Sequence, residues 1–167
     1  VATSNDSGAL VEINSETDFV SRNPDFQLFA KNISNIALKY GSDIDKLKKA
    51  QYLDTSKNVE ETLTELIGLI GENIVLRRTV LIKNSNNSIF SSYIHGQVDS
   101  GLGKIGVILS IESNGDIVKI NEFGKKLAMH IAASKPLAIS SNDVDPAVID
   151  RERKILIEQA IDSGKPD

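Results

Sequence analysis

Hydrophobic residues recur with helical spacing in two stretches of the first half of the chain. Residues 24–40 follow the capping residue Asn23, start with a proline and end at Gly41. Their apolar positions lie three or four residues apart, at Phe26, Phe29, Ala30, Ile33, Ile36, Ala37 and Tyr40. A second stretch of this kind runs from about residue 56 to residue 70 and stops at Gly71. Both stretches predict amphipathic helices.

Shorter apolar runs, several of them rich in β-branched residues, predict four strands, at residues 9–13, 74–82, 89–98 and 107–111. Arg77 and Arg78 lie in the second strand and should point to opposite faces, because side chains alternate along a strand. Two more helices are predicted, at about residues 121–134 and from Asp145-Pro146 to Ser163-Gly164. The polar stretch 83–88 predicts a turn and a boundary between two subdomains.

An internal similarity connects the two halves of the chain. The segment "GALVEINS" begins at Gly8 and "GVILSIES" begins at Gly106, an offset of 98 residues. At the same offset, Ile33 of the first predicted helix matches Ile131 of a later one. Because a strand and a helix agree at one offset, we expect a duplicated strand–helix unit whose two copies superpose.

Length and composition are compatible with an α+β fold of two similar subdomains, each a small antiparallel sheet covered by helices. The chain has 167 residues, of which 40% are hydrophobic and 25% charged, enough for two small cores at residues 1–83 and 84–167. No apolar run approaches the roughly 20 residues of a membrane span, and the first residues do not resemble a signal peptide. A valine at position 1 instead of methionine suggests a fragment of a longer chain.

Charge and residue usage exclude several classes of function. There is no cysteine, so disulfides, thiol catalysis and cysteine metal sites are ruled out, and a reducing cytoplasm is permitted. The net charge is −4, aromatic residues make up 5%, and tryptophan is absent. Direct binding of nucleic acid is therefore disfavoured, since it usually needs a basic stripe with stacking aromatics.

The segment "GLGKIG" matches a dinucleotide-binding pattern through Gly101, Gly103 and Gly106. That mechanism needs a helix after the glycines, to hold phosphate at its N-terminus, whereas a strand follows here. A hairpin connection is therefore the favoured interpretation. There is also no phosphate-loop motif, so the chain is not predicted to be a nucleotide hydrolase of that type.

The two histidines do not predict a catalytic or metal site. Neither His95 nor His130 has ligand-type residues at short spacing. For His130 we expect a partly buried, hydrogen-bonded structural residue. His95 lies beside a glycine at a strand end, where a structural role and a role in binding a partner are equally compatible with the sequence. No nucleophile–base or paired-carboxylate arrangement is recognisable, so the chain is not predicted to be an enzyme.

The segment "NSETDFVSRNPDF" places Asp18 and Phe19 between a strand and a helix start. Side chains of such connections are more often displayed than buried. Phe19 could pack on its own helix, for instance on Phe26, or be presented to a partner. The residues alone leave both interpretations open.

Five segments, "VEINSETDFVSRNPDF", "IGENIVLRR", "SYIHG", "LAMHIAASKP" and "SGKP", resemble the elongation factor Ts family, the exchange factors for the GTPase elongation factor Tu. They occur in the family's order and span nearly the whole chain. The resemblance covers the family's core, which has two similar subdomains, without the N-terminal helical module or the C-terminal tail.

In the family, the residues matching Asp18 and Phe19 insert between helices of the GTPase close to its Mg²⁺ site. Ile70 and Gly71 match residues that contact the GTPase near its phosphate-binding loop, and His95 matches a histidine of the interface. The resemblance thus favours a Phe19 that is presented to a partner. It implies that the second subdomain binds another domain of the GTPase.

The resemblance implies a cytoplasmic guanine-nucleotide exchange factor that performs no bond chemistry. It implies no cofactor, no metal, no membrane and no direct contact with nucleic acid. Two alternatives remain: a module that binds its partner without exchange activity in this truncated form, and a small-molecule enzyme with a polar pocket.

Overall fold

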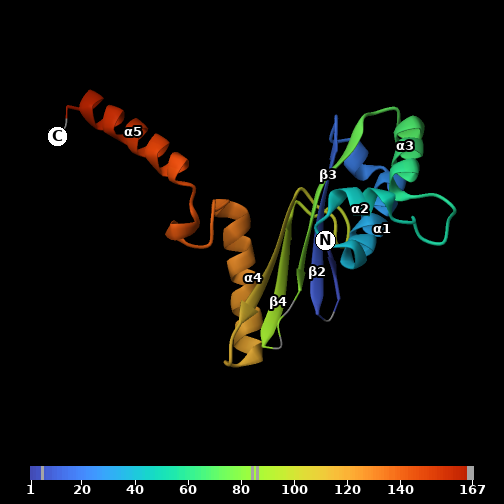
Figure 1. Ribbon diagram of the computed structural model, residues 1–167, viewed down its shortest axis with the longest axis horizontal. Coiled ribbons are helices and arrows are strands. Elements are labelled where there is room, and N and C mark those ends of the chain that lie inside the picture. Colours follow the sequence, from blue (N-terminus) through green and yellow to red (C-terminus); the bar gives the residue numbers. More distant parts are fainter. Residues whose placement is uncertain (5, 84, 86, 165–167) are drawn as a thin grey trace. The chain divides into compact units, whose positions relative to one another are not determined.

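An antiparallel sheet of three strands, in the order β1–β2–β3, carries the first part of the chain (Figure 1). Its strands are β1 (Ala2–Thr3), β2 (Ser7–Ser15) and β3 (Ile74–Lys83). The structure is a computed structural model that describes residues 1–4, 6–83, 85 and 87–164. The polar stretch 83–88 and the final "SGKP" segment therefore lie partly outside the described residues.

Three helices lie together on one face of this sheet: α1 (Pro24–Tyr40), α2 (Ile44–Lys49) and α3 (Val59–Ile70) (Figure 1). The Asn23 side chain accepts hydrogen bonds from two amides of the first turn of α1, and Gly41 ends the helix with φ +76°. Helix α3 starts with a capping box of Asn58 and Glu61, a little later than the sequence predicts.

Helix α2 was not predicted. It has six residues and is capped by Asp43, whose side chain accepts hydrogen bonds from the amides of Asp45 and Lys46. Only Leu47 of this helix is buried. A helix of fewer than two turns shows too few apolar positions to produce a recognisable period.

The first hydrophobic core lies between these helices and the β1–β2–β3 sheet. Its largest fully buried side chains come from the three helices and from β3: Phe29, Ile33, Leu47, Val59 and Ile74. The Phe29 ring stacks on Tyr52 with centroids 5.8 Å apart. The apolar faces predicted for residues 24–40 and 56–70 therefore point into this core.

A β-bulge interrupts the pairing of β2 with β3. Glu12 pairs with Arg78 and Ile13 pairs with Leu76, so Arg77 is the extra residue. Both arginine side chains reach the Glu12 carboxylate, Arg77 at 3.2 Å. The expectation that Arg77 and Arg78 point to opposite faces is wrong, because an extra residue breaks the alternation of side chains.

The second sheet is an antiparallel pair of β4 (Ser88–His95) and β5 (Ile105–Glu112), connected by residues 96–104. At the tip of this connection the Leu102 amide donates to the Asp99 carbonyl at 2.9 Å, and Gly101 adopts φ +78°. A positive φ at the third residue of such a turn favours glycine. The prediction that "GLGKIG" belongs to a hairpin connection is confirmed.

Helix α4 (Ile117–Ser134) packs on the second sheet through small residues one turn apart: Gly124, Ala128 and Ala132. They meet the apolar side chains of β4 and β5, among them Tyr93, Val107 and Leu109. Two amides of its first turn donate to the side chain of Asp116, so α4 starts four residues before its predicted start.

The two sheets meet at the glycines that the sequence repeats. A Cβ atom at Gly8 of β2 would overlap the Phe90 ring of β4, and one at Gly106 of β5 would overlap the Leu10 side chain of β2. Glycine at these positions allows the close approach of the neighbouring sheet. The internal similarity therefore includes the two residues at which the sheets touch.

The predicted α+β class is confirmed, with helices on two small antiparallel sheets. Each sheet has the predicted order of strand and helix, β2 followed by α1 and β5 followed by α4. Both sheets belong to one compact unit, Val1–Ala133. The division into similar subdomains at 1–83 and 84–167, and the superposition of their strand–helix units, stay predictions.

The second unit, Ser134–Asp167, contains the short 3₁₀ helix η2 (Ser141–Asp143) and helix α5 (Pro146–Asp162). The Asp145 side chain caps α5 by accepting from the Ala147 amide at 2.9 Å, as the Asp-Pro opening predicts. None of the residues of α5 is buried. Among the described residues, no helix is both long and apolar enough to cross a membrane.

Two helical glycines provide a matched test of this packing. Gly124→Ala should lower the free energy of unfolding by about 1–3 kcal/mol, because its Cβ would lie 2.9 Å from the Ser91 Cβ of β4. Gly68→Ala in α3 should raise it by about 0.5–1 kcal/mol, because nothing lies within 4 Å of its Cβ. Urea unfolding of both variants measures the difference. Equal effects at the two positions would contradict the packing of α4 on β4.

Candidate functional site

A hydrogen-bonded turn, residues 16–23, connects β2 to α1 and is called the Phe19 turn below. The Asp18 carbonyl accepts from the Ser21 amide at 3.2 Å and from the Ser21 hydroxyl at 2.6 Å. The Arg22 amide donates to the Phe19 carbonyl at 3.0 Å. These bonds form one turn of 3₁₀ helix, η1 (Val20–Arg22), immediately before α1.

Adjacent residues of this turn have opposite environments. Val20 is only 2% exposed and belongs to the first core, whereas Phe19 is 77% exposed. The buried valine holds the turn on the protein, and the phenylalanine points into solvent. The expectation that Phe19 is exposed is confirmed, which is against the interpretation that its ring is packed on its own helix.

Asp18 directly precedes Phe19 in the sequence and is also exposed. Among the residues that the structure describes, its carboxylate accepts no hydrogen bond and forms no ion pair. Both a large apolar ring and a charged group without a partner are thus displayed at neighbouring positions. Such a pair offers hydrophobic area together with hydrogen-bond acceptors.

The end of α3 displays a second group of accessible atoms. Gly71 caps the helix in the left-handed conformation, with φ +79° and ψ 14°, and nothing lies within 4 Å of its Cβ position. Ile70 is half-buried, whereas the preceding Leu69 is 70% exposed. Backbone and apolar side chains are therefore accessible together at this helix end.

The structure brings these two segments together through Thr17 and Glu72. The Thr17 amide donates to Glu72 Oε2 at 2.9 Å, and the Thr17 hydroxyl donates to Glu72 Oε1 at 2.6 Å. Strand pairing places them near each other, since Ser15 at the end of β2 is opposite Ile74 at the start of β3. Asp18 and Gly71 are thus each one residue away from this connection.

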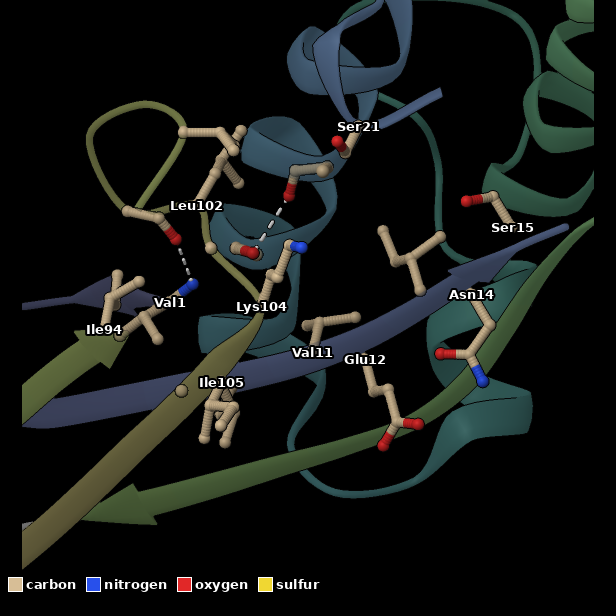
Figure 2. Close-up of a pocket in the computed structure, with 18 of the residues that line it drawn as sticks. Val1, Val11, Glu12, Asn14, Ser15, Ser21, Ile94, Leu102, Lys104 and Ile105 are labelled. Carbon is tan, nitrogen blue, oxygen red and sulfur yellow. Dashed lines mark hydrogen bonds between the residues drawn. The ribbon is translucent and has the colours of Figure 1, made fainter. Parts of the chain in front are cut away.

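A groove of about 890 Å³ runs from the Phe19 turn toward the β4–β5 hairpin. One side is formed by β2, which contributes Val11 and Glu12, and the other by the hairpin, which contributes Leu102 and Lys104 (Figure 2). Lys31 Nζ of α1 forms an ion pair with Asp99 Oδ2 at the hairpin tip, at 2.6 Å. This pair connects the helix to the hairpin.

Two carboxyl groups near the groove have lowered pKa values. Partial burial raises the pKa of Glu12, but the hydrogen bond from Arg78 and the charges of Arg78 and Arg77 together lower it by more. A hydrogen bond from Lys31 and a second from the Ser100 amide lower the pKa of Asp99. Both groups are therefore ionised and paired at neutral pH.

Comparison with known proteins assigns this fold and its exposed turn to a family. A sequence model of the family described as "Elongation factor TS" matches residues 16–167. The chain belongs to the elongation factor Ts family.

Elongation factor Ts of Parvibaculum lavamentivorans is 47% identical over 167 residues, covering 100% of this chain and 54% of the relative. The corresponding protein of Rhizobium meliloti is 43% identical with the same two shares. That of Paramagnetospirillum magneticum is 45% identical over 166 residues, covering 99% of this chain and 53% of the relative. The chain thus spans about half the length of the curated relatives it matches.

His95, the remaining residue that the elongation factor Ts resemblance singles out, lies apart from the Phe19 turn. It is exposed at the end of β4, where the Tyr93 hydroxyl and His95 Nδ1 are 3.3 Å apart. Its carbonyl accepts from the Lys104 amide at 3.0 Å, and Lys104 lines the groove that Asp18 also lines. The groove therefore extends from the Phe19 turn to Lys104, which is hydrogen-bonded to His95.

The partial burial predicted for His130 is wrong, because this residue is exposed on α4. Its position in the predicted helix faces away from the small residues Ala128 and Ala132, which are buried. Burial of a helical residue depends on which face of the helix meets the sheet, and the sequence pattern places His130 only near the edge of the apolar face.

Several residues of the site were not predicted. Thr17 and Glu72 lie in the segments "VEINSETDFVSRNPDF" and "IGENIVLRR", but their contact depends on the register of β2 with β3. The pairing of Lys31 with Asp99 depends on where the hairpin meets α1. Leu69 is an exposed apolar residue, but it is surrounded in the sequence by the apolar residues of α3, so the pattern did not identify it as exposed. None of these could be found from periodicity.

The lowered pKa of Glu12 predicts a pH-dependent contribution to stability. Glu12→Gln should lower the free energy of unfolding by about 1 kcal/mol or less at neutral pH, since the arginines are largely exposed. A depressed folded-state pKa stabilises above the unfolded pKa of about 4.3 and loses this effect as pH falls through the folded value. The difference between wild type and variant should therefore shrink below about pH 4. Urea unfolding from pH 3 to 7 measures it, and a difference independent of pH would contradict the ion pairs.

Proposed function

We propose that this chain is a guanine-nucleotide exchange factor for the GTPase elongation factor Tu, and that it promotes release of GDP. Membership of the elongation factor Ts family supports the partner and the place of action, the cytoplasm. The observation that carries the proposal is Phe19, an aromatic ring that is 77% exposed on a turn held by backbone hydrogen bonds.

The proposed mechanism is a disturbance of the Mg²⁺ and phosphate sites of the GTPase. Mg²⁺ demands near-ideal octahedral geometry, and phosphates are held by pre-shaped rings of backbone amides. Insertion of the Phe19 ring between helices that support these sites displaces their ligands. The Asp18 carboxylate, which has no partner among the described residues, can accept hydrogen bonds that the GTPase otherwise directs elsewhere.

Ile70 and Gly71 are proposed to contact the GTPase near its phosphate-binding loop. The left-handed Gly71 exposes its backbone, because it has no side chain and no neighbour at its Cβ position. Ile70 and Leu69 add apolar area beside it. We propose that His95 belongs to the same interface and that the second subdomain binds another domain of the GTPase and contributes affinity.

The proposed activity needs no bond chemistry, cofactor, membrane or nucleic acid. A factor that weakens GDP binding must itself bind less tightly when GDP is present, because coupling between two ligands is reciprocal. Stabilisation of the nucleotide-free GTPase, followed by displacement when nucleotide returns, therefore allows turnover. The chain spans about half of its relatives, which keeps a second candidate: binding of elongation factor Tu without exchange.

Phe19→Ala should slow the release of GDP from elongation factor Tu about thirtyfold at saturating factor. Truncation of a partner-inserted aromatic typically costs about 2 kcal/mol or more, and this cost falls on exchange. Stability should change little, because the exposed ring adds little to its own core. Asp18→Ala should act in the same direction, and the double variant should show coupling. Stopped-flow release of fluorescent GDP and thermal unfolding measure the two properties.

Phe123→Ala is the matched control, since Phe123 of α4 is also a largely exposed phenylalanine, at 57%. Its exchange rate at saturating factor should equal that of the wild type. Wild-type exchange by Phe19→Ala together with a lowered melting temperature would overturn the site assignment. Binding of elongation factor Tu by the wild type without faster GDP release would favour the second candidate.

A further inference from the structure

Glu72 receives two hydrogen bonds from a single residue, Thr17. Both carboxylate oxygens are used, one by the Thr17 amide at 2.9 Å and one by its hydroxyl at 2.6 Å. Hydrogen bonds to an ionised acceptor are stronger and more directional than neutral ones, and the use of both oxygens fixes the carboxylate plane. We call this pair of bonds the Thr17–Glu72 link.

The Thr17–Glu72 link is poorly suited to a role in stability. Its donors and acceptors are exposed, and it contributes no residue to either hydrophobic core. Exposed polar contacts contribute little to folding, because water competes for the same groups. The location of the link therefore needs another explanation.

The link holds one end of the Phe19 turn, and Gln27 holds the other. Gln27 Nε2 of α1 donates to the Ser21 carbonyl at 2.8 Å. Between these two points, the Asp18 carbonyl accepts from Ser21, as described above. The Phe19 turn is thus held at both ends. Its start is hydrogen-bonded to Glu72, the residue after Gly71, and its end is hydrogen-bonded to Gln27 of α1.

We propose that Glu72 is a positioning residue, which through Thr17 orients the Phe19 turn relative to Ile70 and Gly71. Both segments then meet the GTPase as one preformed surface. This inference rests on the proposed exchange function. A partner that needs one arrangement of two loops binds less tightly when that arrangement is only partly populated. Loss of the link therefore acts on binding and exchange more than on folding.

The first test is a cycle of four proteins: wild type, Glu72→Ala, Phe19→Ala and the double variant. Glu72→Ala should raise the concentration of factor that gives half-maximal GDP release by about fivefold to tenfold. In the Phe19→Ala background the same change should have at most a twofold effect, because the ring that the link orients is gone. An equal effect in both backgrounds would mean that Glu72 acts independently of Phe19, and would overturn the proposal.

Variants of Thr17 test the hydrogen bonds of the Thr17–Glu72 link while the charge of Glu72 is kept. Thr17→Ser keeps both donors and should behave as wild type, whereas Thr17→Val loses the hydroxyl and should show part of the Glu72→Ala effect. Glu65→Ala is the matched control on α3, since Glu65 also accepts two hydrogen bonds, from Lys57 Nζ at 2.5 and 2.7 Å. This variant removes a carboxylate within α3 that accepts from Lys57 and not from the Phe19 turn, and it should leave nucleotide exchange unchanged.

A second measurement needs no GTPase. Amide hydrogen exchange followed by NMR should be about fivefold to tenfold faster at Thr17, Ser21 and Arg22 in Glu72→Ala, and unchanged within α1. Unchanged exchange at these three amides would overturn the proposal whatever the GTPase does. Absence of GDP release by the wild type would overturn the proposed function, whereas wild-type release by Glu72→Ala beside an active wild type would overturn only the role of Glu72.

Discussion

The antiparallel pairing of β2 with β3 is the interaction on which both the first core and the candidate site depend. It joins strands that are far apart in the sequence, and it ends with Ser15 opposite Ile74. The turn that leaves β2 and the helix end that precedes β3 therefore emerge at the same edge of the sheet. In another register Thr17 could not reach Glu72, and the segments that carry Phe19 and Gly71 would not be connected by hydrogen bonds.

Burial in the core and the proposed binding role belong to different side chains of the same short segment. Val20 is buried in the core and Phe19, next to it, is exposed. A 3₁₀ turn makes this separation possible, because consecutive residues point about 120° apart around its axis. The protein can therefore hold a large aromatic ring in water on a rigid backbone. The entropy cost of ordering this backbone is met during folding rather than during binding.

Close packing at two glycines joins the two sheets, and an ion pair connects α1 to the β4–β5 hairpin. Gly8 and Gly106 leave room for a large side chain of the opposite sheet, and the Lys31–Asp99 pair connects α1 to the hairpin tip. Close packing at the glycines is intolerant of added atoms, whereas an exposed ion pair tolerates change. The groove between the Phe19 turn and the hairpin is lined by Leu10 and Gly106, so its width depends on this close packing.

Local signals in the sequence determined much of this protein. The capping residue Asn23 and the glycines after α1 and α3 specify helix ends through neighbouring amides, and the strand after "GLGKIG" identifies a hairpin. The exposure of Phe19 also followed from its place between a strand and a helix cap, together with the family resemblance. Only the tertiary structure decided the bulge at Glu12, the Thr17–Glu72 link and the Lys31–Asp99 pair. These contacts join residues 55 to 68 positions apart whose side chains are polar and partly exposed, so they leave no periodic pattern in the sequence.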